Sequence, residues 1–85
     1  MKIEIPSYTT LSGRPLTILR MIQDAQFFSE QTPADLETFI LDLRQNIWRV
    51  FGIGIDVQGT TIEEQAESLL REMDKHNIIK ILKED

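Results

Sequence analysis

The sequence has no cysteine, one histidine and no long apolar run. Without cysteine it can form neither disulfides nor thiolate metal sites, and it has no cysteine nucleophile. A membrane-spanning helix needs about 18 or more consecutive apolar residues. The first ten residues, MKIEIPSYTT, lack the apolar core of a signal peptide. We therefore expect a cytoplasmic protein that contacts no membrane and is stabilised by side-chain packing.

Basic side chains are also scarce. Nine Lys and Arg stand against 14 Asp and Glu, which gives a net charge of −5. Binding to a phosphate backbone needs a concentrated basic face. A helix-turn-helix reader would also need a short turn between its helices, whereas residues 52–61 form a long gap between the second and third expected helices. The sequence therefore predicts no direct binding to nucleic acid.

The apolar spacing that is present predicts an α+β protein. At 85 residues the chain fits a single small globular domain over 1–85. Helices are expected at 15–29, 33–51 and 62–76, and strands at 2–5, 53–58 and 78–83. The order β-α-α-β-α-β predicts a small two- or three-stranded sheet packed with three helices, its last two strands parallel. The competing arrangement is a helical bundle with a two-stranded ribbon made by the termini.

Residues 8–15, YTTLSGRP, mix β-branched and turn residues and could form either a second short strand or a loop. The loop is favoured because Ser12, Gly13 and Pro15 cluster there. The second helix is the strongest helical pattern. Its apolar residues step by four and three and predict a core-facing stripe. That stripe consists of Leu36, Ile40, Leu43, Ile47 and Val50.

Cap residues mark the ends of the expected helices. Thr32 is predicted as N-cap of the second helix and Gly52 as its left-handed C-cap. Thr61 with Glu64 three residues later fits a capping box at the start of the third helix. Asn77 suits the left-handed position just after that helix.

The stretch GIDVQGTT, residues 54–61, comes close to the phosphate-binding pattern GxxxxGK[ST]. Gly54, Gly59 and Thr61 match it, but Thr60 stands where the lysine is needed. Asp56 and two glutamates in the following helical turn place negative charge where a phosphate would sit. The stretch therefore predicts a turn, and no cofactor is expected.

Other candidate chemistry is weak. His76 has no second imidazole or thiolate with which to share a metal ion. The acidic side of the third helix includes the favourable i,i+4 pair of Glu67 and Arg71 and is typical of a solvated face. We therefore expect that the protein is not an enzyme and that it binds neither a metal ion nor a cofactor.

Apolar residues outside the core-facing stripes are the main indication of function. Leu41 and Trp48 lie seven residues apart on the second helix, off its main stripe. Packing of such residues inside the domain is one interpretation, and a docking patch for a second copy or another protein is the other. The predicted partner-binding residues, including two rim arginines, are Leu16, Leu19, Arg20, Phe27, Leu41, Arg44 and Trp48.

We accordingly predict a non-enzymatic protein-interaction, accessory or regulatory module that binds another protein or itself. The alternative is an acidic inhibitor or nucleic-acid mimic that binds a basic protein. Its acidic residues would be Glu63, Glu64, Glu67, Glu72 and Asp74.

Two stretches carry a resemblance to a known group of proteins. LSGRPLTILRMIQ, followed by a helix and then by GIGIDVQGTTIEEQAESLLREM, resembles small proteins encoded by bacterial phage and mobile elements. The resemblance implies an accessory or regulatory role and supplies no catalytic residues.

Overall fold

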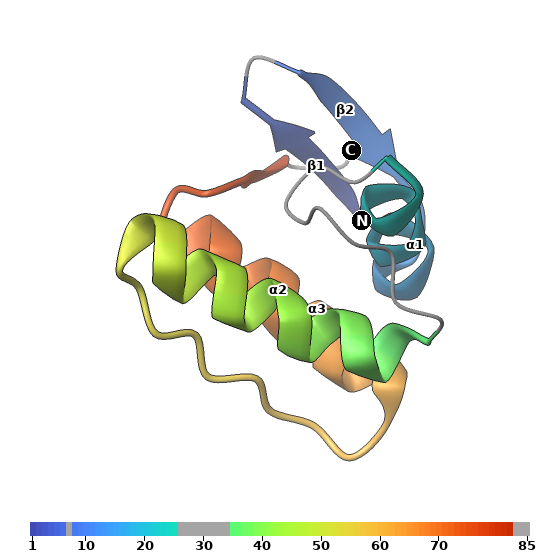
Figure 1. The fold of residues 1–85 in the computed structure, drawn as a ribbon. Helices are drawn as coiled ribbons and strands as arrows, with labels where there is room; N and C mark the ends of the chain where they lie inside the picture. The colour runs from blue at the N-terminus through green and yellow to red at the C-terminus, as the bar shows by residue number, and fades with distance from the viewer. Residues whose placement is uncertain (7, 26–34, 83–85) are drawn as a thin grey trace.

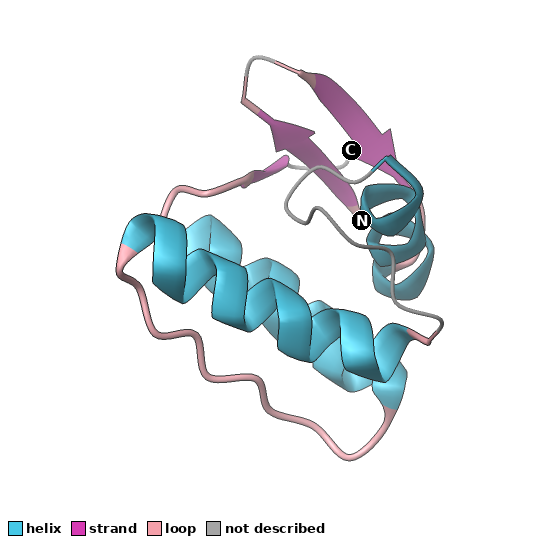
Figure 2. Cartoon of the chain, viewed as in Figure 1, coloured by secondary structure: helices cyan, strands magenta, loops and turns pink. Residues whose placement is uncertain are grey.

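The computed structural model describes residues 1–6, 8–25 and 35–82. These residues form three helices and a three-stranded sheet, so the predicted α+β class is confirmed (Figures 1 and 2). The elements in chain order are β1 (Lys2–Ile5), β2 (Thr9–Ser12), α1 (Pro15–Ala25), α2 (Leu36–Phe51), α3 (Ile62–Lys75) and β3 (Lys80–Leu82). No helix within the described residues is long and apolar enough to span a membrane.

The sheet has the order β2-β1-β3, and both pairings are antiparallel. Ile3 in the central strand pairs with Leu11 on one side and Ile81 on the other. Ile3 and Ile5 are buried, whereas Lys2 and Glu4 are exposed. This alternation is expected of a strand with one face on the core.

The strand assignments differ from the prediction at two places. For residues 8–15 the favoured loop was wrong and the alternative, a second short strand, is found: Thr9–Ser12 forms a hairpin with β1. Residues 53–58 were expected to be a strand, but they form a segment outside the sheet. A hairpin partner a few residues away costs little loop-closure entropy, which favours the pairing of β1 with β2. The central strand also pairs with β3, and among the described residues no strands pair in parallel, so the predicted parallel pair was wrong.

Both ends of α2 are fixed by caps. The helix begins at Leu36, and Asp35 is its N-cap, because the Asp35 carboxylate accepts a bond from the Thr38 backbone N–H at 2.7 Å. Thr32 as N-cap was therefore wrong, and Thr32 itself lies outside the described residues, as does the predicted extension of α1 to residue 29. Gly52 has φ 69°, which confirms the left-handed C-cap.

Helix α3 ends in a Schellman motif, with His76 as its C-cap. Asn77 has φ 62°, as predicted. The Ile78 N–H donates to the Met73 carbonyl at 2.8 Å, and the Asn77 N–H donates to the Asp74 carbonyl at 3.0 Å. At the other end, Thr61 accepts from the Glu64 backbone N–H at 3.1 Å, which confirms its role as N-cap.

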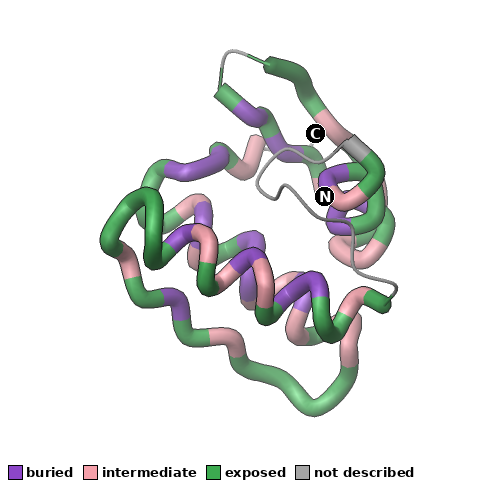
Figure 3. The backbone as a smooth tube through the Cα atoms, in the orientation of Figure 1, coloured by how far each residue is buried: buried purple, intermediate pink, exposed green. Residues whose placement is uncertain are grey.

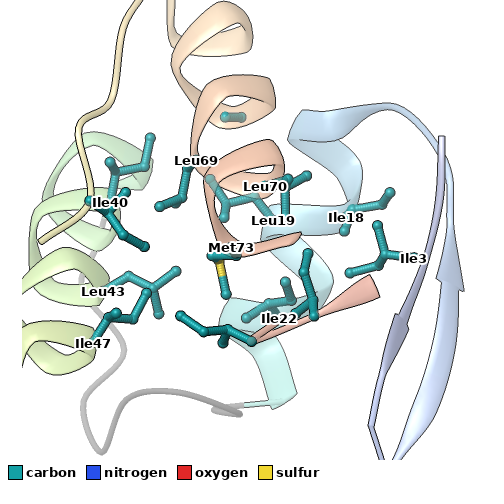
Figure 4. Close-up of a cluster of buried hydrophobic side chains, with 14 of the residues drawn as sticks. Ile3, Ile18, Leu19, Ile22, Ile40, Leu43, Ile47, Leu69, Leu70 and Met73 are labelled. Atoms are coloured by element: carbon teal, nitrogen blue, oxygen red, sulfur yellow. The ribbon is translucent and has the colours of Figure 1, made fainter. Parts of the chain in front are cut away.

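The core lies on both sides of α3 (Figures 3 and 4). Leu69 and Met73 lie toward the buried stripe of α2, while Leu70 lies near α1 and the sheet (Figure 4). The stripe of α2 consists of Phe39, Ile40, Leu43 and Ile47. Val50, predicted as part of it, is 72% exposed because it lies at the end of the helix, beyond the core.

Candidate functional site

Helix α2 has a second apolar side, opposite its buried stripe. Leu41 is 56% exposed and Trp48 is 64% exposed. Residues seven apart lie on the same side of an α-helix, two turns from each other. The described part of the chain thus leaves these two large side chains mainly open to solvent, with no part in the core.

The segment that follows α2 runs back along this helix (Figure 1). It begins at the left-handed turn at Gly52, and residues 53–58 form neither helix nor strand. Ile55 turns inward and is 5% exposed, while Gly54 and Asp56 on either side are exposed. The Arg44 Nε–H donates to the Ile55 carbonyl at 3.0 Å, and this bond ties the segment to the helix.

Between α2 and this segment lies an open groove of about 730 Å³. Its described lining residues are Leu41, Arg44, Gln45, Trp48, Arg49, Gly54 and Ile55. We call this feature the α2 groove. Its walls combine aliphatic and indole surface with one amide and two guanidinium groups.

The two arginines of the α2 groove have no carboxylate partner within the described part of the chain. The ion pairs found there join Arg14 to Glu63 and Arg71 to Glu67. Arg44 is half-buried and makes only its bond to the segment, and Arg49 is exposed. Both guanidinium groups therefore keep donors that can bind an anionic group from outside.

The structure brings together three of the seven predicted partner-binding residues, namely Leu41, Arg44 and Trp48. Leu19 is fully buried, so its prediction as a surface residue was wrong: α1 is covered both by α3 and by the sheet. Leu16 is half-buried and packs against the core.

The other two predicted residues are not part of this groove. Arg20 is exposed on α1 and does not line the α2 groove. Phe27 lies outside the described residues.

Sequence reasoning missed four lining residues. Gln45 lies four residues after Leu41 and three before Trp48, so helical spacing alone could have found it, and Arg49 follows on the same side. Gly54 and Ile55 join the groove only because the chain reverses at the end of α2. The glycine cap was predicted, but the residues after it were expected to form a strand of the sheet.

The residues of GIDVQGTT that match the phosphate pattern serve the turn before α3. Gly59 has φ 127°, and a Cβ there would lie 2.6 Å from the Glu64 Cβ, so only glycine fits this close approach. The hydroxyls of Thr60 and Thr61 both donate to the Glu64 carboxylate, at 3.3 and 3.1 Å. The N-terminal end of α3 is thus capped by the residues that directly precede it.

The acidic side of α3 borders a second groove, of about 570 Å³. Glu63, Glu67 and Asp74 of α3, of which only Glu67 lines the groove, have partners within the chain. Glu67 pairs with Arg71 at 3.0 Å, and outside the groove Glu63 pairs with Arg14 at 3.4 Å. The Asp74 carboxylate accepts from the Ile81 N–H at 2.9 Å and so holds β3. These acids have structural partners, which reduces the charge they offer to a partner protein.

Asp35 and His76, which lie outside both grooves, are cap residues of helices. Hydrogen bonds from the backbone N–H and the hydroxyl of Thr38 lower the pKa of Asp35 below its ordinary value, 3.8. His76 is exposed at the C-cap of α3. The described residues contain no group of three His, Asp or Glu side chains that could hold a metal ion.

No protein-family model, curated protein or solved structure matches this chain. The geometry of the α2 groove therefore carries the functional argument.

Proposed function

We propose that this chain is a non-enzymatic protein-interaction module that docks a partner protein in the α2 groove. The observation that carries the proposal is the exposure of Leu41 and Trp48 on the outer side of a helix whose inner side builds the core. Tryptophan and arginine are enriched among residues that dominate binding energy at protein interfaces. The α2 groove contains one tryptophan and two arginines within six residues of helix, Arg44 to Arg49.

The chemistry of the lining supports docking rather than catalysis. The described lining residues are Leu, Ile, Trp, Gly, Gln and two Arg. They include no hydroxyl or thiol nucleophile, no carboxylate and no imidazole, which are the groups that act in nucleophilic and general acid–base catalysis. The same set suits a buried anchor with a polar rim.

The role we propose is accessory or regulatory. The resemblance of the sequence to small proteins of phage and mobile elements favours that role, and we propose that the protein acts in the cytoplasm.

An acidic inhibitor or mimic is the second candidate. The groove beside α3 favours it, because Asp56, Glu64, Glu67 and Glu72 line that groove. Arg71 and Lys75 line it too, and Glu67 is already paired. Salt separates the two candidates. A complex led by charge weakens steeply as ionic strength rises, whereas a complex anchored by Leu41 and Trp48 weakens little.

The proposed function is tested by affinity capture from an extract of the source cell. Three forms serve as bait: the wild type, Leu41→Glu and the matched control Val50→Glu. Val50 is on the same helix and 72% exposed, but it does not line the α2 groove. Each captured protein is then purified, and its binding to all three forms is measured by calorimetry.

We expect a partner that binds the wild type and Val50→Glu equally and Leu41→Glu at least about tenfold more weakly, since a buried charge is costly at an interface. Equal binding to all three forms would place the docking surface elsewhere and contradict the proposal.

A further inference from the structure

We infer that the α2 groove binds an acidic segment of another protein, in which carboxylates flank a large apolar side chain. This inference rests on the proposed function. The charge and the spacing of the groove residues determine which partner chemistry fits.

The charge of the α2 groove is opposite to that of the whole chain. The chain carries a net charge of −5, yet the described groove lining holds Arg44 and Arg49 and no acid. Helix α2 has two acidic residues, Glu37 and Asp42, and neither lines the groove. Two arginines without carboxylate partners, gathered on an acidic molecule, complement an anionic partner.

Arg44 is already held in place for such a contact. Its Nε–H is fixed by the Ile55 carbonyl at 3.0 Å, which orients the guanidinium plane and leaves its terminal nitrogens free to donate. A planar guanidinium binds a carboxylate through two parallel hydrogen bonds. Because Arg44 is half-buried, solvent screens this contact less than it screens a fully exposed ion pair.

Leu41 and Trp48 provide the apolar surface on which an apolar side chain of the partner would pack. Seven residues of helix separate them by about 10 Å along the axis, and Arg44 and Gln45 lie between them in the chain. A large apolar side chain that packs on the indole therefore lies within reach of Arg44 and Arg49. This spacing favours a segment whose acidic residues flank its anchor.

A second copy of the chain fits the groove poorly. If two α2 helices packed antiparallel, Leu41 would face Trp48 of the other copy. The two-fold axis would then pass between positions 44 and 45, so the two Arg44 side chains would approach each other. Like charges at an interface are unfavourable. The occupant we propose is therefore a different protein.

The inference is tested with a library of short random peptides displayed on phage. The library is selected in parallel on the wild type, Arg49→Glu, Gly54→Leu and the control Lys2→Glu. Arg49 is exposed in the last turn of α2 and takes part in neither ion pair found among the described residues, and Lys2 is an exposed cation on β1. Gly54 lines the groove, and a Cβ there would meet no heavy atom within 4 Å, so leucine can narrow the groove without disturbing the core. Circular dichroism checks that every variant is folded.

We expect the wild type to enrich peptides with Asp or Glu beside Leu, Phe or Trp. A synthetic peptide of the enriched sequence should bind Lys2→Glu like the wild type. Its affinity should fall about tenfold or more for Arg49→Glu, because a hydrogen bond to a charged group is lost and a repulsion is gained. Gly54→Leu should abolish binding.

Each other outcome has a distinct meaning. Peptides enriched on the wild type without an excess of acids, or bound equally by Arg49→Glu, would overturn the inference and leave the proposed function standing. No enrichment on the wild type beyond that on Gly54→Leu would contradict the proposed function itself. A dimer in sedimentation that Leu41→Glu abolishes would make a second copy the occupant and overturn the inference.

Discussion

Leu41 and Leu43 lie two residues apart on α2 and allow the same substitution on opposite sides of the helix. Leu43 is fully buried in the core, whereas Leu41 is 56% exposed in the α2 groove. Replacing each by alanine removes the same atoms. Only the surroundings differ, so the pair separates a folding role from a docking role.

The expected costs follow from burial. A fully buried leucine loses transfer free energy and leaves a cavity, so Leu43→Ala should lower the free energy of unfolding by about 2–5 kcal/mol. Full burial of a leucine is worth about 1.5–3 kcal/mol. Less than half of the Leu41 side chain is covered, and alanine is the better helix former. Leu41→Ala should therefore cost less than about 1 kcal/mol.

Urea unfolding followed by far-ultraviolet circular dichroism measures both values. Tryptophan fluorescence would report poorly on the core, because the single tryptophan, Trp48, is 64% exposed. In thermal melts Leu43→Ala should lower Tm by roughly 8 °C or more, since about 1 kcal/mol corresponds to 4–8 °C in a domain of this size. Equal losses for the two variants would mean that Leu41 is a core residue, and the groove argument would fail.

Three further predictions concern the helix caps and are measured by the same unfolding experiments. Thr61→Ala removes the N-cap bond of α3 and should cost about 1 kcal/mol, whereas Thr61→Ser should cost little; equal effects would rule out the cap. Asn77 has φ 62°, so Asn77→Gly should leave stability unchanged or raise it and Asn77→Ala should lower it by about 1 kcal/mol; the reverse order would contradict the left-handed cap. Hydrogen bonds from Thr38 lower the pKa of Asp35 below 3.8, so the stability contributed by this carboxylate is complete well above pH 3.8 and is lost as the pH falls through its folded-state pKa. From about pH 5 to about pH 2 the wild type should lose more stability than Asp35→Asn, which keeps a neutral cap, and parallel curves would show that Asp35 is not held as an anion.

Local patterns predicted the helices well. Gly52 and Asn77 were predicted as left-handed caps because the conformations of these positions depend on their nearest neighbours. Thr32 failed as a cap since Asp35, three residues later, offers a carboxylate to the Thr38 N–H. Asp35 is also a residue type favoured at the N-cap, and spacing alone did not show that the helix begins after it.

Strand pairing and the groove depend on tertiary contacts. The alternation in residues 53–57 predicted a strand, which was wrong, although its inward position is real, since Ile55 is buried between exposed neighbours. The partner could not be predicted: the segment packs along α2, and its Ile55 carbonyl is bound by Arg44 rather than by a strand. Of the two interpretations of the apolar residues off the helical stripes, exposure holds for Leu41 and Trp48, whereas Leu19 is fully buried.

The central claim is that the α2 groove is a docking site for another protein. Amide chemical shifts of the labelled chain, followed during titration with the captured partner or with the enriched peptide, test it most directly. We predict that the largest shifts occur at residues 41–49 and 53–57, and that those of β2 stay in place. Large shifts confined to α3 or to the sheet, with residues 41–49 unmoved, would contradict the claim.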